Sequence, residues 1–509
     1  MSLVQSIDYA AIAPVLVIAI SALVVLVVDL FVPDERRTVA AYVSLLGTAG
    51  ALGVTAWLAT GEPRQTFCFA SGGCSYVTDD FTLFFQVLFL AALLVVLLLS
   101  LPLFGDRRIP AGEYHALLLT SVTGMLVLPA ARDLLTLLIA LEVVSLPAFV
   151  LVGLRRGDSR GSEAALKFFL FSVISTAFTV YGMALLYGAT GSIELGHISH
   201  SLAGIRAHPG AGAAFTGAGV VLVLVGFAFK ISAVPFHFWA PDTYQGAPVP
   251  VAAFLSVASK AAGFAGLIVL LVHGFRAYAD VWGPVIAVLA AVTMTVGNVV
   301  ALRQWQLVRL LAWSTVAQAG YLLVPLGVAS TQRGRSPALL NDGVEATLTY
   351  LGIYAAMNLG AFACVALVSR RYPRAAIEDV RGLVYTAPAT AVLLAFFLTA
   401  LAGLPPGVAG LFAKVVVLRA AVDGHVTWLA VVAAVNTVIG LAYYLRVAAL
   451  VFAPQAEPGD ARMRWADHWA EHRTDHRAGA VALALTAVVT LALSVYPQPL
   501  LHAAGLAAR

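Results

Sequence analysis

The stretch FKISAVPFHFWAPD, residues 229–242, decides how this sequence is interpreted, because an apolar helical run that carries a lysine meets a proline within it. Residues 401–414, LAGLPPGVAGLFAK, have the same character: prolines and glycines interrupt an apolar run that contains Lys414. Both stretches predict interrupted helices, and broken backbone at membrane depth is tolerated where it is buried in protein or lines a watery cavity. Corresponding breaks in two halves of a chain indicate an inverted repeat with sites at the breaks.

The composition places the whole chain in a membrane. Of its 509 residues, 61% are hydrophobic and only 11% are charged, whereas soluble domains carry about 25% charged residues. This excludes a soluble enzyme and predicts an all-α, polytopic membrane protein. Apolar runs of about 20 residues predict about fourteen transmembrane helices. The predicted spans are residues 10–32, 38–60, 80–104, 114–130, 133–154, 164–190, 212–240, 250–273, 282–302, 307–329, 343–369, 388–420, 426–453 and 479–496.

Arginines are spread unevenly over the connections between these spans. Seventeen lie on the alternate connections that begin with Arg36 and Arg37, with Arg309 at the start of the adjoining span counted among them, and seven lie on the other connections or at the C-terminal end. An excess of basic residues marks cytoplasmic loops. Residues 1–14 lack the positive region of a cleavable signal peptide. We therefore expect a multi-pass protein with a retained first helix and its N-terminus outside, and the net charge of +4 gives no indication of nucleic acid.

The four lysines, Lys167, Lys230, Lys260 and Lys414, all fall inside predicted spans. The connections use arginine, which stays protonated, whereas the pKa of lysine moves readily when the side chain is desolvated. Charge inside a membrane is functional by default, which applies to Lys230, Lys260 and Lys414. Lys167 has an equally good structural interpretation, as an i,i+4 ion pair with Glu163 near a helix start.

Glu142 is an acid in the middle of a predicted span. An isolated carboxylate in hydrocarbon is costly, so this group must be neutral, hydrated or paired with a cation from another helix. Lys230 is the expected partner, and a static ion pair that only locks two helices together is the alternative. His237 lies beside the first break, where a place in a proton path and a structural hydrogen bond are equally good interpretations.

Cysteines and clustered histidines give weaker signals. Three cysteines cannot ligate an iron–sulfur cluster alone, and we expect no metal, cofactor or redox centre in this chain. Cys68 and Cys74 share a predicted loop, where either a disulfide or two free thiols are allowed. His468, His472 and His476 recur at i,i+4,i+8, where an amphipathic interfacial helix is favoured over a metal site.

Several stretches resemble the antiporter-like membrane subunits of respiratory complex I. Residues 230–264, KISAVPFHFWAPDTYQGAPVPVAAFLSVASKAAGF, carry the closest resemblance. Within them, QGAPVPVAAFLSVASKAAG, residues 245–263, looks like subunit N, and it separates this chain from subunits L and M and from Mrp-type antiporter subunits. Similar stretches lie at residues 309–327 (RLLAWSTVAQAGYLLVPLG), 357–365 (MNLGAFACV), 378–383 (EDVRGL) and 401–414.

The resemblance implies two inverted five-helix repeats with broken helices 7 and 12. The implied divisions are residues 1–110, a three-helix segment; 111–275, the first repeat; 276–453, the second repeat; and 454–509, a loop and the last helix. It further implies a proton-translocating subunit in the membrane arm of NADH:quinone oxidoreductase, in a bacterial plasma membrane. The partners would be other membrane-arm and peripheral-arm subunits, which would hold NADH, FMN, iron–sulfur clusters and quinone, and membrane lipid.

The family pattern also implies roles for individual residues. Glu142 and Lys230 would form a charged pair, Lys167 would modulate it, Lys260 would be the central relay and Lys414 the terminal relay. Many relatives have histidine where this chain has Gln318, whose amide does not titrate. Protons passing between Lys260 and Lys414 would then need water, and the side chains that we expect to hold it are Thr315, Gln318, Tyr354 and Asn358.

A physical mechanism follows from the charged residues themselves. Moving a carboxylate away from a buried lysine lowers the pKa of the amine and releases its proton, and coupled titrations pass the change along. Moving one charge against 100 mV costs about 2.3 kcal/mol, which a pKa change of about two units matches at 1.36 kcal/mol per unit. Two alternatives remain open: a Mrp-type cation/proton antiporter subunit, and a structural membrane subunit without its own proton path.

Overall fold

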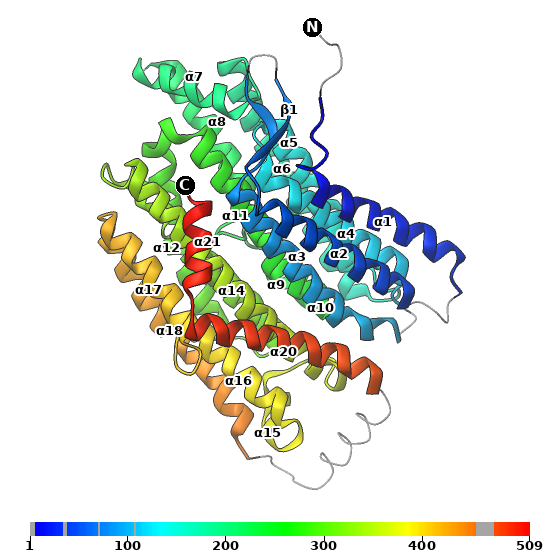
Figure 1. Ribbon diagram of the computed structural model, residues 1–509. Helices are drawn as coiled ribbons and strands as arrows, with labels where there is room; N and C mark the ends of the chain where they lie inside the picture. The colour runs from blue at the N-terminus through cyan, green and yellow to red at the C-terminus, as the bar shows by residue number, and fades with distance from the viewer. Residues whose placement is uncertain (1–5, 34–37, 70–71, 106–107, 209, 455–472) are drawn as a thin grey trace.

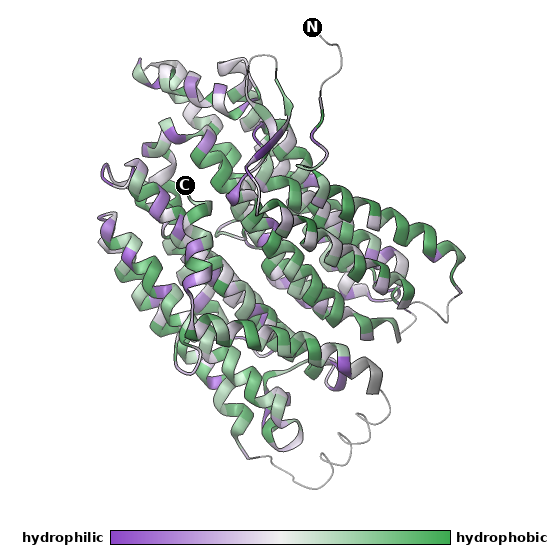
Figure 2. Cartoon of the chain, viewed as in Figure 1, coloured by the Kyte–Doolittle hydropathy of each residue, from purple (hydrophilic) through white to green (hydrophobic). Residues whose placement is uncertain are grey.

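The computed structural model describes residues 6–33, 38–69, 72–105, 108–208, 210–454 and 473–509. They form a bundle of helices with one small β-hairpin (Figure 1). Apolar residues dominate along the helices, and polar residues gather at the helix ends and connections (Figure 2). This distribution suits hydrocarbon, in which a helix satisfies all of its own backbone hydrogen bonds.

The helices are described in two halves, which meet at the short turns between α11 and α12. The first half contains α1 (Ala13–Phe31), α2 (Thr38–Leu58), α3 (Asp80–Ser100), α4 (Ala111–Val127), α5 (Leu134–Gly153), α6 (Ser159–Thr190), α7 (Leu195–Ala207), α8 (Ala211–Lys230), α9 (Trp239–Gly246), α10 (Val249–Phe254) and α11 (Lys260–Val269). The second half contains α12 (Ala279–Ala301), α13 (Leu307–Leu323), α14 (Pro337–Arg371), α15 (Leu383–Thr386), α16 (Pro388–Ala402), α17 (Val408–Asp423), α18 (Thr427–Phe452), α20 (Arg473–Val495) and α21 (Gln498–Ala507). A π-helical turn, η4 (Leu255–Ser259), joins α10 to α11.

The predicted membrane spans are all present as helices. Within the described residues, twelve helices are long and apolar enough to cross a membrane, and two shorter apolar helices lie at 307–323 and 388–402. Together they match the fourteen predicted spans one to one, so the all-α polytopic prediction is confirmed. The structure adds α7 and α21, which are too short to have been recognised as apolar runs of spanning length.

Polar loop residues fix where several of the helices begin. The carboxylates of Asp79 and Asp133 accept hydrogen bonds from backbone N–H groups in the first turns of α3 and α5, respectively. Asp158 does the same for α6, and the Ser336 hydroxyl does it for α14. Each cap satisfies an N–H group that the helix itself leaves unpaired. These four residues therefore fix where α3, α5, α6 and α14 begin.

Both predicted breaks are present. Helix α8 ends at Lys230 and α9 begins only at Trp239, while α16 ends at Ala402 and α17 begins at Val408. Each connection contains a cis X–Pro peptide bond, at Pro235 and at Pro406. Helix α4 packs on α5 as α12 packs on α13, in the order that two repeats would have. The division into four segments stays a prediction.

The hairpin and the chain end complete the bundle. Strands β1 (Arg64–Cys68) and β2 (Cys74–Thr78) pair antiparallel, and a disulfide joins Cys68 to Cys74, one of the two states that the sequence allowed. The hairpin lies at the same end of the bundle as α7 (Figure 1). Helices α20 and α21 both pack on α3 and α14, so the chain end contacts both halves. The predicted histidine cluster at 468, 472 and 476 lies outside the described residues and side chains.

Candidate functional site

Lys230 is the last residue of α8, directly before the first break, and its side chain is buried. Its ammonium group donates hydrogen bonds to the hydroxyl of Ser145 on α5 and to that of Ser172 on α6, the latter at 3.3 Å. Cations are favoured at the C-terminal end of a helix, where unpaired carbonyl groups carry partial negative charge. Hydroxyl oxygens and the helix end therefore surround this amine.

Glu142 is held apart from Lys230. Its Oε1 accepts a hydrogen bond of 2.8 Å from the Thr176 hydroxyl on α6. Within the described residues, no hydrogen bond and no ion pair within 4.0 Å joins Glu142 to Lys230. Ser145, the partner of Lys230, follows Glu142 by three residues and so lies one turn further along the same face of α5. The expected pair is thus adjacent but not in direct contact.

Beside Glu142, α5 carries a stripe of apolar side chains that the described residues leave about half exposed. Leu135, Ile139, Leu146 and Val150 recur on this face at intervals of three or four residues around Glu142, and each is about half exposed. Glu142 itself is intermediate in exposure. Such a stripe of apolar side chains faces either lipid or another protein. The acid therefore lies at the edge of the bundle and not at its centre.

Lys167 lies nearer the N-terminal end of α6, and its side chain is 44% exposed. Its ammonium is 2.8 Å from Glu163 Oε1 and 3.3 Å from Asp242 Oδ2 on α9. Nine residues separate it from Thr176, a distance of about 13 Å along a helix. The i,i+4 ion pair of Lys167 with Glu163, one of the two interpretations of this lysine, is therefore present, and Asp242 is a second carboxylate partner.

Lys260 is fully buried at the start of α11, directly after the π-helical turn η4. Its ammonium donates a hydrogen bond of 2.8 Å to the backbone carbonyl of Thr315 on α13. Among the described residues no carboxylate forms an ion pair with it. An unpaired buried charge is expensive, and single π-helical turns are frequent at functional sites. Both features single out this lysine.

Lys230 and Lys260 lie on segments in close contact. A Cβ atom added to Gly263, which follows Lys260 by three residues, would stand 3.1 Å from the Cβ of Lys230 and 2.8 Å from the Ile231 side chain. Only a residue without a side chain permits this approach. Gly263 therefore lets the end of α8 pack against α11.

Lys414 is buried on α17, one turn and a half after the second break. Its ammonium donates a hydrogen bond of 2.7 Å to the carbonyl of Ala402, the last residue of α16, and lies 5.6 Å from the centre of the Tyr321 ring. Gly403, with φ +85°, ends α16 in the left-handed region. The amine therefore caps the carbonyl end of a half-helix and lies over an aromatic face, an arrangement that favours a cation.

Helix α13 lies between the second and third buried lysines. Thr315, Gln318 and Tyr321 follow one another every three residues, so they share one face. The backbone carbonyl of Thr315 contacts Lys260 and the Tyr321 ring contacts Lys414, which places the two contacts six residues, or about 9 Å, apart along the helix. Both lysines thus contact α13.

Gln318 occupies the middle of this face, and two tyrosines fix its amide. Its Oε1 accepts a hydrogen bond from Tyr350, and its Nε2 donates one of 3.3 Å to Tyr444. The Tyr350 ring in turn stacks on Tyr321, with ring centres 6.1 Å apart. A polar chain of side chains therefore runs from Gln318 to the ring beneath Lys414.

Two of the other residues predicted to hold water contact η4, whereas the Thr315 hydroxyl donates a hydrogen bond of 2.7 Å to the Leu311 carbonyl of its own helix. Tyr354 donates a hydrogen bond of 3.0 Å to the carbonyl of Ser256, and Asn358 Nδ2 donates one of 2.7 Å to the Ser256 hydroxyl. Asn358 Oδ1 has no hydrogen-bond partner among the described residues. His237 is buried, and its Nδ1 likewise has none within that part of the chain. Buried polar atoms of this kind are commonly satisfied by ordered water.

Sequence reasoning missed several residues that contact the predicted site. Ser145, Ser172, Tyr321 and the acid Asp242 contact lysines. Ser256, Tyr350 and Tyr444 contact the predicted water-holding side chains. Ser145 had a usable signal, since it is a polar residue one helical turn from Glu142 inside an apolar span. The tyrosines had none, because their contacts join helices that are far apart in sequence.

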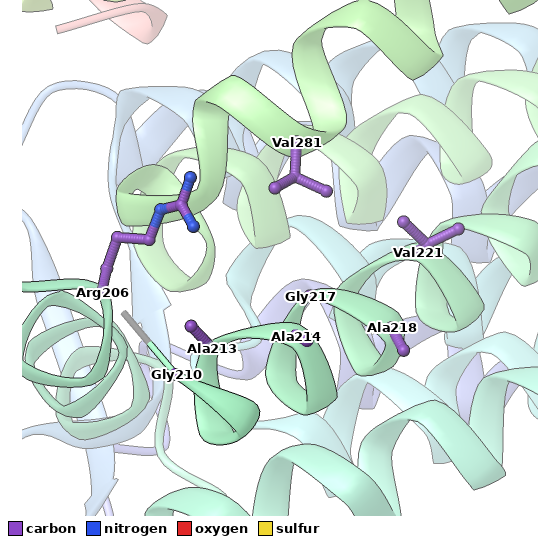
Figure 3. A pocket seen from close by; sticks show the side chains of 8 residues that line it. All are labelled: Arg206, Gly210, Ala213, Ala214, Gly217, Ala218, Val221 and Val281. Atoms are coloured by element: carbon purple, nitrogen blue, oxygen red, sulfur yellow. The ribbon is translucent and has the colours of Figure 1, made fainter. Parts of the chain in front are cut away.

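Among the cavities in the described part of the bundle, two are considered for the site. One of about 750 Å³ lies at the end where α6 begins and α14 ends, and Lys167, Asp242, Tyr244 and Gln306 are among its lining residues. The other, of about 590 Å³, lies between α7, α8 and α12 (Figure 3). Its lining consists of Arg206 and mostly small side chains: Gly210, Ala213, Ala214, Gly217, Ala218, Val221 and Val281. Only the first cavity includes a predicted site residue.

Comparison with known proteins identifies the family. Residues 131–440 match the family described as NADH:quinone oxidoreductase/Mrp antiporter, transmembrane. NADH-quinone oxidoreductase subunit N 2 of Streptomyces griseus is 50% identical over 99% of this chain and 94% of that protein. The chain belongs to the subunit N family of NADH-quinone oxidoreductase. Subunit N of Salinispora tropica is 45% identical over 89% of this chain and 87% of that protein.

Solved structures have the same fold as this subunit N chain. A chain of respiratory complex I from Thermus thermophilus with bound aureothin is 31% identical, covers 96% of this chain and 98% of that one, and aligns with a TM-score of 0.73. A chain of the Mrp complex from Dietzia sp. is 23% identical, with coverage of 98% and 97% and a TM-score of 0.82, which shows the fold alone. The resemblance noted in the sequence to antiporter-like subunits of complex I is thus confirmed.

Proposed function

We propose that this subunit N chain translocates protons in the membrane arm of an NADH:quinone oxidoreductase, through the buried lysines Lys230, Lys260 and Lys414. One observation carries the proposal: two of these amines contact α13, at the Thr315 carbonyl and over the Tyr321 ring, and the third lies on the segment that packs against Gly263. Buried amines in a continuous arrangement of hydroxyl, amide and phenol groups are the parts that a proton relay needs.

The proposed relay begins at Glu142. Thr176 holds its carboxylate away from Lys230, whose own partners are hydroxyl groups. A movement of Glu142 toward Lys230 would stabilise the ammonium form, and a movement back would favour loss of the proton. Each change of charge at Lys230 acts on Lys260 through the adjoining segment, and repulsion between like charges carries the displacement onward.

The second part of the proposed relay joins Lys260 to Lys414. Gln318 does not titrate, so it acts by orienting hydrogen bonds and water and does not itself change charge. Tyr350 and Tyr321 continue this line toward Lys414. The partnerless Oδ1 of Asn358 and Nδ1 of His237, within the described part of the chain, mark positions where water would complete it.

The driving energy would come from partner subunits. The comparisons name relatives that are subunits of NADH-quinone oxidoreductase, an enzyme complex. We infer that NADH, FMN, iron–sulfur clusters and quinone are bound by other subunits and that this chain contributes no redox centre. We also place the chain in a bacterial plasma membrane, surrounded by lipid, with its N-terminus outside.

A Mrp-type cation/proton antiporter subunit is the second candidate, because a chain of the Mrp complex from Dietzia shares the fold. It predicts sodium-dependent proton flux in liposomes without any redox partner. A purely structural subunit instead predicts that loss of a buried lysine impairs assembly and leaves proton translocation per electron pair unchanged.

Lys260→Met tests the proposal, because methionine keeps the volume and removes the titrating amine. In inside-out membrane vesicles with the complete complex, we expect NADH-driven acidification to fall at least about tenfold while the complex still assembles. Thr347→Val is the control, since this buried hydroxyl on α14 bonds only to backbone carbonyls. Normal acidification in an assembled Lys260→Met complex would exclude the relay.

A further inference from the structure

The carboxylate of Asp242 lies where the two halves of the chain meet. It belongs to α9, the short helix that follows the first break. Its Oδ2 is 3.3 Å from Lys167 Nζ on α6, and its Oδ1 is 2.9 Å from Arg309 Nη1 on α13. One carboxylate thus binds one cation from each half of the chain.

Each of these cations has a second partner, on its own helix for Lys167 and on α9 for Arg309. Lys167 is also 2.8 Å from Glu163 Oε1, one turn earlier on α6. Arg309 also donates a hydrogen bond of 2.6 Å to Gln245 Oε1, on the same short helix as Asp242. Asp242 is therefore the carboxylate in this cluster that joins α6 to α13.

The two cations lie on the helices that hold the buried lysines. Ser172, which accepts a hydrogen bond from Lys230, follows Lys167 by five residues on α6. Thr315, whose carbonyl accepts a hydrogen bond from Lys260, follows Arg309 by six residues on α13. These separations correspond to about 8 to 9 Å along a helix. Because a helix is stiff, a shift of α6 or α13 at Asp242 also moves the residue on that helix that contacts Lys230 or Lys260.

We propose that Asp242 is a positioning residue of the relay, which holds α6 and α13 in register so that Lys230 and Lys260 keep their partners. This inference rests on the proposed function. It also gives Lys167 a defined role: the influence of Lys167 on the relay passes through Asp242, since nine residues separate it from Thr176, the partner of Glu142. The wall of the 750 Å³ cavity, which includes Lys167 and Asp242, is the place where this contact is open to water.

A contribution to folding stability does not account for the ion pairs of Asp242 with Lys167 and Arg309. The side chains of Asp242, Lys167 and Arg309 are 34%, 44% and 35% exposed, respectively. Ion pairs with this exposure are screened by water and contribute little to folding stability. Loss of the Asp242 charge is therefore expected to alter the geometry of the relay and not the assembly of the complex.

Asp242→Asn in the complete complex, in inside-out vesicles, tests the inference. We expect normal assembly on native gels and normal NADH oxidation in uncoupled vesicles, with about a fivefold fall in protons moved per electron pair. Glu163→Gln is the matched control: it removes the other carboxylate from Lys167 without affecting Arg309, and we expect less than about a twofold change. Asp242→Glu is expected to recover about half of the loss.

The double variant Lys167→Met/Asp242→Asn separates coupling from independent damage. If the two residues act through one contact, the double variant moves about as many protons per electron pair as Asp242→Asn alone. Additive losses would overturn the inference, as would an Asp242→Asn complex that behaves like Glu163→Gln, or a loss of assembly that Asp242→Glu does not rescue. Normal proton movement in Lys260→Met would refute the proposed function. Loss in Lys260→Met with normal movement in Asp242→Asn would refute this inference alone.

Discussion

Both helix breaks have a buried lysine near the end of a half-helix, but the groups that contact the two lysines differ. At the first, Lys230 ends the half-helix and is bound by the hydroxyls of Ser145 and Ser172, with Glu142 one turn away on α5. At the second, Lys414 follows the break and caps the carbonyl end of α16, and no carboxylate pairs with it in the described chain. The difference indicates a direction for the proposed relay. Glu142 can change the charge state of Lys230, whereas Lys414 has no acid beside it in the described chain and would respond to the charge of the other lysines.

Glu142→Gln is expected to have the strongest effect, because it removes the acid that distinguishes the first site from the second. Glutamine keeps the shape and the bond with Thr176 but carries no charge. We expect proton translocation per NADH to fall about tenfold, the equivalent of 1.4 kcal/mol of lost coupling. The measurement is NADH-driven acidification of inside-out vesicles, with the exposed Glu113→Gln as a charge-matched control. Unchanged translocation would mean that both breaks work without an acid.

Gln318→Leu breaks the connection between the two sites. It removes the acceptor of the Tyr350 hydroxyl and one of the partners of Tyr444, which also contacts the Ser314 hydroxyl, and loss of one member of a buried network affects the rest. We expect about a fivefold fall in translocation, whereas Gln318→His, which keeps a polar side chain at this position, should stay within about twofold of the unmodified chain. Equal activity of the leucine and histidine variants would show that the protons bypass this face of α13.

Gly403→Ala and Ser232→Gly compare the backbone of the two breaks. Both positions are left-handed, with φ +85° at Gly403 and φ +59° at Ser232. A side chain in this region costs about 1 to 2 kcal/mol, so alanine should destabilise the second break by about that amount and glycine should stabilise the first. Hydrogen exchange of the amides on either side of each break measures the local opening. The same sign of change in both variants would contradict the expectation.

Much of this comparison was predictable from sequence, because charge and helix breaks are rare in apolar spans. Lys230, Lys260 and Lys414 stand out in that background, and all three are buried in the structure. The interruptions after Lys230 and before Lys414 followed from their prolines and glycines. These are signals of composition along a single helix, which a sequence displays directly.

The partners of the charged residues were less predictable, because a contact between helices depends on how they rotate and pack. Glu142 was expected to pair with Lys230, yet it is bound by Thr176, a residue without any distinguishing pattern. Asp242 lies in a stretch whose prolines drew attention to the break and not to its acid. Its two cations come from residues 75 positions before it and 67 after it, separations over which no periodicity acts.

Thr176→Val is expected to have a weak effect, since it alters how Glu142 is held without removing the acid. It tests whether the position of the acid matters at the first break. Valine matches the volume of threonine but cannot donate the 2.8 Å hydrogen bond to Oε1. The freed carboxylate can then turn toward Lys230 and stabilise its ammonium form, which slows the release of the proton. We expect about a twofold fall in translocation per NADH, in line with the loss of one hydrogen bond to a charged group that can find water instead.

Thr123→Val serves as the control, because that hydroxyl bonds only to the Leu119 carbonyl of its own helix. A loss as large as that of Glu142→Gln would show that the acid works only while Thr176 holds it. An unchanged ratio would show that its resting position is immaterial. Between those results, the twofold effect would mean that Glu142 acts by moving, and that the first break is controlled by a mobile acid that the second break lacks.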